Sequence, residues 1–486
     1  FVKIGRFIDK KNKDKAVDTI KNLVTITPKK GTILKDNKEI EVNINEIEKG
    51  DIVVSKPGEK IAVDGTIING KTHTDESFIT GESKPVSKSI GDNVIAGSVN
   101  YDGYIKYKAE RIGKDSSISN IVTMVVEATN TKAPIARVAD KISGYFVPTI
   151  FIISLVAFVL NLVLTTDINE AILALVSVLV VACPCALGLA TPLAMVVAIG
   201  NCSKNGILVK SSEILEATNK IDTIVFDKTG TLTTGKMTIV DGVYSKENLK
   251  ILKSLEKNSN HPLAKSIYND EKDIFSVEEF KEEPGLGIKG KINGIQYFAG
   301  NYKYVEKMQV ENKLKVEEEK IISKGESIVY LFNKKETLLI IGLADTIKKD
   351  VVKTVNELKK LDKKIFMLTG DNDKTAKIIA KQVGIENVIS NVSPKQLEKI
   401  KELNSNNNCA MVGDGINDSP SLKTATIGIS VENGTDISAD SSDVILLNEN
   451  MSNILKLFKI GKNTIRIIKQ NLFWALFYNI CMIPLA

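Results

Sequence analysis

Two long apolar runs interrupt an otherwise polar chain. Tyr145–Leu164 is twenty residues without a charged side chain, and Ala171–Gly200 is thirty. A bilayer core about 30 Å thick is crossed by about 20 helical residues. The pattern therefore predicts two transmembrane helices, at 142–164 and 170–200.

A third apolar run begins at Asn471 and reaches the C-terminus at Ala486, which is short of a full span of about 20 residues. We therefore predict the start of a truncated transmembrane helix at 465–486. Because the first residue is Phe1 rather than methionine, we expect a fragment that is cut at both ends. Residues 1–23 are basic and amphipathic, and they are predicted to form a helical linker from a missing membrane helix.

The polar segments have the patterns of folded soluble domains. Over residues 24–130, short β-like runs are separated by Gly and Pro, which predicts a small, mostly β domain. From Ile214 onward apolar strands alternate with helices, as in a doubly wound parallel sheet. A polar segment at 236–339 interrupts this pattern and predicts an inserted α+β domain between two α/β parts, 213–235 and 340–446.

Charge and composition narrow the possible functions. The net charge of +6 is modest, and no basic face interleaved with aromatic residues is visible, which argues against nucleic-acid binding. Five cysteines are too few for a disulfide framework and fit a reducing compartment. Basic residues border the apolar runs, whereas the loop Thr165–Glu170 between the first two runs has acidic residues only. By the positive-inside rule, the large polar segments are therefore expected to be cytosolic.

The most informative stretch follows the apolar run Ile221–Phe226. It reads Asp227-Lys228-Thr229-Gly230-Thr231-Leu232-Thr233. A carboxylate at the end of a strand, beside a lysine and hydroxyl groups, can attack a phosphoryl group and become an aspartyl-phosphate. Four such residues alone would as readily be a turn that closes a strand. All seven together resemble the phosphorylation motif of P-type ATPases.

Other strand ends carry the residues that this chemistry needs. They are Thr369-Gly370-Asp371, Asp414 and Asp418. Since the carboxyl ends of parallel strands meet at one edge of a sheet, we expect these residues to converge with Asp227 and to bind Mg²⁺. An isolated Asp-Gly pair is more often a hairpin turn. Three such strand ends after the phosphorylation motif, in this order, resemble the haloacid-dehalogenase-type core of the P-type ATPases. The resemblance implies catalytic roles for Asp227, Lys228, Thr229, Thr369, Gly370 and Asp371. It implies Mg²⁺ ligands at Asp227, Thr229, Asp414 and Asp418.

The β domain contains Asp75-Glu76-Ser77-Phe78-Ile79-Thr80-Gly81-Glu82-Ser83-Lys84-Pro85-Val86. A glutamate on a Thr-Gly turn could position water to hydrolyse an acyl phosphate, although an isolated turn of this kind is usually only an exposed turn. The string resembles the actuator loop of P-type ATPases. The resemblance implies that Thr80, Gly81 and Glu82 serve dephosphorylation.

The second apolar run contains Cys183-Pro184-Cys185. A proline inside a helix frees backbone carbonyls at membrane depth, and thiolates beside it suit a soft ion such as Cu(I), with Zn(II) also possible. The alternative is a pair of small buried cysteines at a structural kink. Cys-Pro-Cys in a membrane helix resembles the heavy-metal branch of the P-type ATPases, in which it is the transport-site signature.

In the third run, Tyr478 and Asn479 are polar residues in an apolar setting, which makes them candidates for a functional site. An interfacial aromatic beside a helix-packing asparagine is the simpler explanation. The pattern Tyr-Asn-x₄-Pro, with Asn471 seven residues before the tyrosine, resembles the copper(I)-transporting subgroup.

The inserted domain contains the pair His261-Pro262 at the start of an expected helix. A lone histidine is usually solvent-facing or packed, but this pair resembles the motif with which heavy-metal ATPases recognise adenine. Gly285, Gly287 and Gly290 match a dinucleotide motif in spacing, yet strand and turn follow them, so the βαβ context is missing. The resemblance instead assigns these three glycines, with Gly300 and Asn301, to the ATP pocket, where backbone approaches the nucleotide closely.

Two positions depart from the family pattern. Lys348 stands where the family usually has arginine, and Leu397 stands where it normally has a lysine three residues after a proline such as Pro394. Lys395 is the nearest candidate to stabilise phosphate charge.

These observations predict a fragment of a heavy-metal P-type ATPase that uses ATP and Mg²⁺ to export Cu(I). A pump of the same branch that transports Zn²⁺ or Cd²⁺ is the alternative. A non-transporting phosphatase with the same core is disfavoured by the Cys-Pro-Cys helix, and a metal-binding scaffold by the intact catalytic string. We expect an integral protein of the plasma membrane, in contact with lipid and its metal ion, with cytosolic domains and no nucleic-acid partner. A soluble metal chaperone is a further partner that the resemblance allows.

Overall fold

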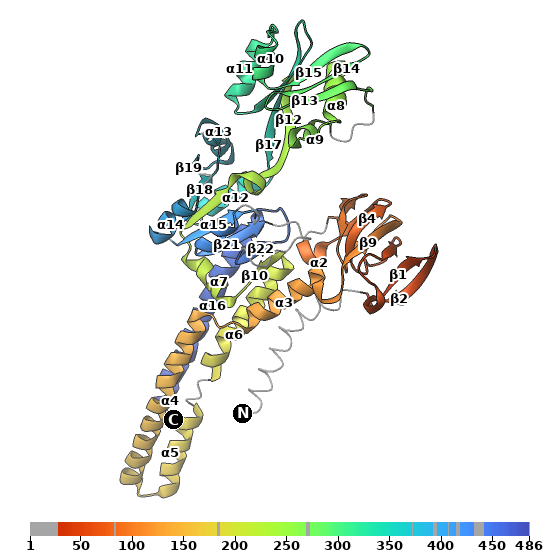
Figure 1. Ribbon diagram of the computed structural model, residues 1–486. Helices are drawn as coiled ribbons and strands as arrows, with labels where there is room; N and C mark the ends of the chain where they lie inside the picture. Colours follow the sequence, from red (N-terminus) through yellow and green to blue (C-terminus); the bar gives the residue numbers. More distant parts are fainter. Residues whose placement is uncertain are drawn as a thin grey trace. The chain divides into compact units, whose positions relative to one another are not determined.

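The protein is described by a computed structural model (Figure 1). The described residues are 28–81, 84–181, 185–268, 273–371, 373–391, 396–406, 408–414, 418–431 and 442–485. The predicted linker 1–23 and three predicted site residues, Glu82, Cys183 and Lys395, lie outside them. The chain divides into two compact units. The first comprises Phe1–Asp222, Ile400–Met411 and Gly415–Ala486, and the second comprises Thr223–Lys399 and Val412–Asp414.

The β domain of the first unit is built on a six-stranded sheet with the order β2-β1-β3-β9-β4-β7. Its strands are β1 (Lys30–Lys35), β2 (Lys38–Asn43), β3 (Ile52–Ser55), β4 (Asp64–Asn69), β7 (Asn93–Val94) and β9 (Ile105–Arg111). Alternation along β9 buries Ile105, Tyr107 and Ala109 and leaves the lysines between them outside. The Tyr107 hydroxyl accepts a hydrogen bond from the Ala62 amide at 3.1 Å, which satisfies its polar end inside the core.

A smaller sheet, β6-β5-β8, carries the predicted actuator loop. It consists of β5 (Thr72–Asp75), β6 (Val86–Lys88) and β8 (Val99–Asn100), and the short helix α2 (Ser77–Thr80) follows β5. Asp64, which is buried, accepts hydrogen bonds from the amides of Ala96 at 2.7 Å and Ser117 at 2.6 Å. These bonds join the β domain to helix α3 (Ser117–Asn130).

The first unit also contains long helices. They are α4 (Pro134–Thr165), α5 (Ile168–Val181), α6 (Cys185–Lys204) and α16 (Ser452–Met482). Among the described residues one candidate membrane span is found, within Ser117–Thr165, and only 11% of its most apolar window is buried; α5 is a shorter apolar helix. Apolar side chains therefore face outward over most of that span, as they do against lipid. α4 and α5 run side by side (Figure 1), with Ile150 packed against Val178.

The predicted span 170–200 corresponds to two helices, α5 and α6, and the three residues between them lie outside the described residues. The predicted loop Thr165–Glu170 is shorter than expected, because α5 already begins at Ile168. The Asp167 side chain accepts the Asn169 amide at 2.8 Å and so caps the start of α5, which gives this residue a local structural role.

The α/β strands follow the doubly wound pattern in each unit. In the first unit the order is β10-β22-β21-β20, with β10 (Ile207–Val209) antiparallel to β22 (Val444–Leu446), and β22 parallel to β21 (Ile427–Val431). In the second, the end of β20 (Cys409–Gly413) continues the order β20-β11-β18-β19. There β11 (Thr223–Asp227), β18 (Lys364–Leu368) and β19 (Asn387–Ile389) are parallel.

Short helices accompany these strands. They are α7 (Ser212–Ala217), α12 (Val351–Lys359), α13 (Asp373–Val383), α14 (Gln396–Asn406) and α15 (Ser419–Thr424). The inner strands are almost wholly buried, as expected of parallel strands that are covered on both faces, whereas the edge strand β19 is partly exposed.

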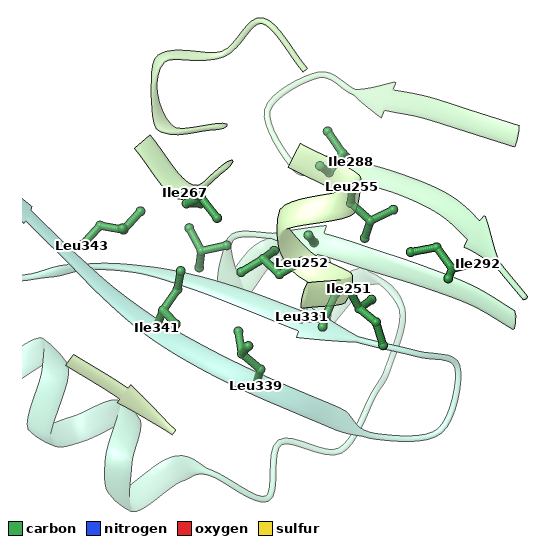
Figure 2. Close-up of a cluster of buried hydrophobic side chains, with 12 residues drawn as sticks. Ile251, Leu252, Leu255, Ile267, Ile288, Ile292, Leu331, Leu339, Ile341 and Leu343 are labelled. Atoms are coloured by element: carbon green, nitrogen blue, oxygen red, sulfur yellow. The ribbon is translucent and has the colours of Figure 1, made fainter. Parts of the chain in front are cut away.

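The inserted domain is a six-stranded antiparallel sheet with the order β12-β17-β16-β15-β14-β13. Its strands are β12 (Thr233–Val243), β13 (Glu278–Glu283), β14 (Gly287–Ile292), β15 (Ile295–Gly300), β16 (Ser327–Phe332) and β17 (Thr337–Ile347). Helices α8 (Lys246–Glu256) and α9 (Pro262–Tyr268) supply Ile251, Leu252, Leu255 and Ile267 to the main core against this sheet (Figure 2). A second cluster joins Tyr304 of α10 (Tyr302–Lys307) and Ile321 of α11 (Lys315–Ser323) to Phe298 and Phe332 of the sheet.

Two long strands connect the inserted sheet to the α/β core. β12 leaves the Asp227 loop and β17 returns toward α12, and the two pair antiparallel from Thr233–Ile347 to Val243–Ile340. The predicted boundaries at 235/236 and 339/340 therefore fall inside strands. A paired ribbon rather than two loose linkers carries the inserted domain.

Candidate active site

Asp227 is the last residue of β11, at the carboxyl end of a strand whose other four residues are buried. In the parallel pairing with β18, Asp227 stands opposite Leu368, so Thr369 is the next residue at the same edge. Thr369 is buried and Asp227 is partly exposed. The parallel register thus places the carboxylate and the threonine together, as the sequence predicted for strand ends.

The segment Lys228–Leu232 turns sharply after Asp227. Gly230 has φ +72°, a left-handed conformation that favours glycine. A Cβ built there would lie 3.4 Å from Cβ of Asp414, so Asp414 lies directly against the loop. Lys348 Nζ donates to the Gly230 carbonyl at 2.8 Å. The lysine that departs from the family pattern therefore holds the shape of the Lys228–Leu232 loop.

A second group of hydrogen bonds holds the end of the loop. Thr233 Oγ1 contacts the Lys228 carbonyl at 2.9 Å and Asp345 Oδ2 at 2.5 Å. The two long strands that begin and end here are thus connected through side chains as well as through their backbone ladder.

An ion pair joins the two motifs of the site. Lys228 Nζ lies 2.8 Å from Asp371 Oδ2, with the lysine side chain 13% and the carboxylate 31% exposed. The Asp371 amide donates to Thr369 Oγ1 at 3.1 Å, and the Asp371 carbonyl accepts the Asn391 amide at 3.0 Å. Lys228 is therefore held beside Asp227 by a carboxylate from the neighbouring strand.

The carboxylates fit Mg²⁺ bound together with a phosphate. Mg²⁺ commonly takes one or two protein carboxylates and completes its shell with water and phosphate oxygens. Asp227 and Asp414 come from strand ends that meet at the Gly230 loop. Among the described residues no cluster of three or more His, Cys, Asp or Glu side chains could hold a metal by itself. Asp418 precedes α15 in the first unit, where it is buried.

A cavity of about 840 Å³ opens beside this site within the second unit. Lys228, Asp371 and Lys374 line it from the α/β core, and Lys324 and Glu326 line it from the inserted domain. Burial raises the pKa of Glu326, with the charge of Asp241 adding to the effect. The volume suits a drug- or nucleotide-sized ligand.

The predicted glycines of the inserted domain fall into two groups. Gly287 pairs with Gly300, and a Cβ on either would lie 2.0 or 2.1 Å from a carbonyl oxygen of the opposite strand. Asn301 Nδ2 donates to the Gly285 carbonyl at 2.9 Å, so Gly285, Gly287, Gly300 and Asn301 form one cluster. Gly290 instead faces α8, where a Cβ would lie 2.9 Å from Leu255 Cδ2. Its need for glycine is explained by helix-on-sheet packing.

His261 immediately precedes α9, whose first residue is Pro262. The imidazole is exposed; its Nδ1 accepts the Leu263 amide at 3.3 Å, and the His261 amide donates to Ser259 Oγ at 3.2 Å. The ring is thus oriented by its own turn, with Nε2 on the side away from that backbone contact. Its neutral form with Nδ1 as acceptor carries the proton on Nε2.

Glu256, which the sequence did not single out, is a buried carboxylate in the same domain as His261 and the glycine cluster. It ends α8, and its carbonyl accepts the Ser259 amide at 3.0 Å in the turn before His261. Burial raises the pKa of its carboxyl to about 7, and the charge of Glu282 adds to this. Glu282 pairs with Ile288, next to Gly287. A glutamate five residues before the His-Pro pair, at the end of an amphipathic helix, was the available signal.

This pKa makes the inserted domain sensitive to pH. The pKa is about 7 in the folded protein and 4.5 for the ordinary group, so between these values the folded state binds a proton that the unfolded chain releases. We predict that stability falls as pH rises through this window, by roughly 3 kcal/mol at most. Hydrogen exchange of the α8 amides at pH 5 and pH 8, corrected for intrinsic exchange, measures this change. Glu256→Gln should remove the pH dependence, and an unchanged dependence in that variant would contradict the assignment.

The actuator turn is anchored within the first unit. Asn448 Nδ2 donates to the Thr80 carbonyl at 2.6 Å, and Asn453 Nδ2 donates to Asn448 Oδ1 at 2.9 Å, which orients the first amide. Gly206 has φ +69°, and a Cβ there would lie 2.6 Å from the Thr80 oxygen. Gly81 is also left-handed, with φ +72°. The turn that precedes Glu82 therefore packs backbone to backbone on the segment after α6, and Asn448 is a second residue that sequence reasoning missed.

The residues that we predict to bind the metal in the membrane are only partly described. Cys185 is the first residue of α6, and α6 packs along α16. Asn479 of α16 is buried, whereas the Tyr478 side chain is about half exposed. These two neighbours therefore point to different surroundings, and the metal-binding role of each stays a prediction. Cys202, which we expected to be a packing residue, is fully buried.

Comparisons with known proteins agree with this architecture. Residues 25–126 match the P-type ATPase actuator domain, and residues 221–426 match the haloacid dehalogenase-like hydrolase family. The chain is 41% identical to the copper-exporting P-type ATPase of Staphylococcus saprophyticus, over 99% of the chain and 62% of that protein. It is 39% identical to the probable copper-importing P-type ATPase A of Enterococcus hirae, over 99% of the chain and 68% of that protein.

A solved structure of a zinc-transporting PIB-type ATPase in the E2·Pi state is 28% identical, with a TM-score of 0.64 over 98% of this chain and 80% of that one. The chain belongs to the P-type ATPases, in their heavy-metal branch. The predicted fold class, an actuator domain joined to a haloacid-dehalogenase-like core, is thereby confirmed. The chain spans 62% of the length of the Staphylococcus saprophyticus relative.

Proposed function

We propose that this chain performs the ATP-driven steps of a pump that exports Cu(I) across the plasma membrane through an aspartyl-phosphate. The observation that carries the proposal is the convergence at Asp227, where the Lys228–Asp371 ion pair and Asp414 surround the strand end. This arrangement supplies a carboxylate nucleophile, a fixed cation and a second carboxylate.

In the proposed first step a carboxylate oxygen of Asp227 attacks the γ-phosphorus of ATP, and the bond to the β–γ bridging oxygen breaks to release ADP. Asp227 and Asp414, with Thr229 beside them, would hold Mg²⁺, which when bound neutralises charge on the phosphate oxygens. Thr369, Gly370 and Asp371 flank the incoming phosphoryl group. Lys395 remains the candidate for a further phosphate contact.

The nucleotide is proposed to bind the inserted domain. The exposed His261 ring has an Nε2–H free of its own turn, while Pro262 starts the helix behind it. The cluster of Gly285, Gly287, Gly300 and Asn301 offers backbone without side-chain cover, and Gly290 supports it from the packed side. The buried Glu256 would add a hydrogen-bond donor, because its raised pKa of about 7 keeps part of its carboxyl neutral near neutral pH.

The return step is proposed to use the actuator turn. Glu82, which follows Thr80 and Gly81, accepts a proton from water as the water attacks phosphorus, so that phosphate leaves and the Asp227 carboxylate is restored. The anchoring of the Thr80 carbonyl by Asn448 supports this role, because a turn held by backbone contacts presents its next residue in a defined direction.

The cargo is proposed to bind in the membrane at Cys183 and Cys185, with Tyr478 and Asn479 as further ligands. Thiolates select soft ions, among which Cu(I) fits best and Zn(II) or Cd(II) fit less well. Two relatives at about 40% identity carry copper in their names, one as exporter and one as probable importer. The zinc-transporting structure, at 28% identity, keeps the Zn²⁺ alternative as second candidate. A soluble metal chaperone would deliver Cu(I) from the cytosol.

Replacing the nucleophile tests the catalytic assignment. Asp227→Asn keeps the size of the side chain but removes the attacking oxygen charge, so acid-stable phosphoenzyme from labelled ATP should fall below detection, at least about a hundredfold. Asp222→Asn, an exposed aspartate just before β11, is the matched control and should label normally. Persistent labelling of the Asp227→Asn variant would contradict the assignment of Asp227 as the nucleophile.

Replacing Glu82 separates formation from decay of the phosphoenzyme. Glu82→Ala should form phosphoenzyme at the normal rate and hydrolyse it about a hundredfold more slowly, in line with loss of a general base. A chase with unlabelled ATP measures the decay. Normal turnover in this variant would exclude the role.

The metal dependence of phosphoenzyme formation tests which ion the protein transports. Under reducing conditions, phosphoenzyme formation should be stimulated by Cu⁺ and Ag⁺ more than by Zn²⁺ or Cd²⁺, because the thiolates favour soft monovalent ions. The double variant Cys183→Ser and Cys185→Ser should lose the stimulation, whereas Cys409→Ser, a buried cysteine of the α/β core, should retain it. Stimulation by Zn²⁺ alone would favour the alternative cargo.

A further inference from the structure

A basic cavity lies on α16 just above its apolar end. Its volume is about 390 Å³, and it belongs to the first unit. The residues that line it are Asn219, Lys462, Ile465, Arg466, Lys469, Gln470 and Phe473. Six of them come from α16, and Asn219 comes from the short turn Thr218–Lys220 that packs against this helix.

The wall that Asn219 contributes is closely packed on α16. A Cβ on Gly461 would lie 2.0 Å from Thr218 Oγ1 and 3.1 Å from the Leu215 carbonyl, so the turn touches the helix backbone itself. Asn219 follows Thr218 directly, so this contact places it beside the helix. The cavity is therefore a shallow, open recess between the turn and the helix.

The charged side chains that line the cavity are all positive. Lys462, Arg466 and Lys469 stand at positions i, i+4 and i+7 of the helix, which places them on one face. No carboxylate lines the cavity, and within the described part of the chain none of the three cations forms an ion pair. The two amides, Asn219 and Gln470, add hydrogen-bond donors. The recess thus presents donors and positive charge to an anion.

The position of the cavity along α16 indicates a membrane surface. After Lys469 and Gln470 the helix becomes apolar, and Phe473, Trp474 and Phe477 are exposed and packed on one another with centroids 5.4 to 5.8 Å apart. Aromatic residues of this kind gather at the interface between lipid and water. Lys469 and Arg466 stand roughly 6 and 10 Å above Phe473 at 1.5 Å per residue. The height of Lys469 falls within the headgroup layer, which is about 5–8 Å thick on each side, and Arg466 stands just beyond that layer.

We propose that this cavity binds the phosphate of an anionic phospholipid, whose acyl chains then lie along the exposed Phe473 and Trp474. The inference rests on the proposed membrane function, because it requires the end of α16 to be inserted. The occupant is a lipid rather than a free phosphate, since the recess is continuous with the apolar surface at Phe473 and Ile465. The bound headgroup fixes the depth of the helix that runs from Asn453, beside the actuator anchor, into the membrane.

The single tryptophan of the chain reports on this site. Trp474 follows the cavity residue Phe473, so acyl-brominated lipid bound there quenches its fluorescence. In nanodiscs of phosphatidylcholine with phosphatidylglycerol, brominated phosphatidylglycerol should quench more strongly than brominated phosphatidylcholine at equal mole fraction. Arg466→Gln should lower the preference about fivefold, since each cation near an anionic surface contributes a factor of that order. The triple variant with Lys462→Gln and Lys469→Gln should abolish it.

Lys456→Gln is the matched control, because it makes the same charge change on an exposed lysine of α16 outside the cavity. It should leave the preference unchanged, and an equal loss in this variant would show a general surface effect and overturn the site. Displacement of the lipid by millimolar glycerol phosphate would show a soluble anion site and would also overturn the proposal. Quenching by both lipids without preference would reject the headgroup site alone. Absence of quenching by either lipid would reject membrane insertion of α16, and with it the proposed function.

Discussion

The Lys228–Asp371 ion pair is the contact on which the geometry of the proposed active site depends. Its two residues lie 143 positions apart, and its N–O distance is 2.8 Å with both side chains mostly covered. Removing the carboxylate would leave a largely buried ammonium without its partner, at a cost of roughly 3 kcal/mol. Because β11 and β18 are parallel neighbours, the pair also holds the loops after both strands in register. Asp227 is thereby presented at a rigid edge rather than on a free loop.

The same loop is tied to the inserted domain by a continuous structure. Lys348, at the end of β17, holds the Gly230 carbonyl, while Thr233, at the start of β12, holds Asp345. Any rotation of the inserted sheet must therefore pass through the ribbon of β12 and β17 into the residues around Asp227. A hydrogen-bonded ribbon transmits twist better than two flexible linkers, because its two strands cannot move independently. The substitution of lysine for arginine at position 348 keeps the positive charge and the reach that this contact needs.

In the first unit, too, a few contacts connect segments that are distant in the sequence. Asn448 and Asn453 connect the actuator turn to the start of α16, and the basic cavity lies lower on the same helix. Gly206 and Gly81 allow the two backbones to approach, and a side chain at either position would collide with a backbone atom. One continuous helix thus connects the anchor of the actuator turn to the basic cavity. Its 31 residues make that connection stiff along the helix axis.

Much of the fold was predictable from local patterns. Short apolar runs before Asp227, Thr369 and Asp414 indicated strands, and the structure has a strand at each place, because burial and hydrogen bonding of four or five residues are local properties. The long apolar run that ends near residue 164 similarly indicated a membrane-length helix. The resemblance to the family could also be recognised from the sequence, because its motifs are short contiguous stretches at strand ends and turns.

The sequence by itself determined which residues could do chemistry and roughly which stretches form strands and helices. Only the tertiary structure decided which of these residues meet. The Asn448–Thr80 bond spans 368 positions, and the pKa of Glu256 depends on a sheet and a charge supplied by other segments. The basic cavity required Asn219 to pack beside α16, although the cations themselves were visible as a helical stripe. The physical reason is that periodicity reports the environment of a single element, whereas strand order, burial and through-space charge depend on segments that are distant in the chain.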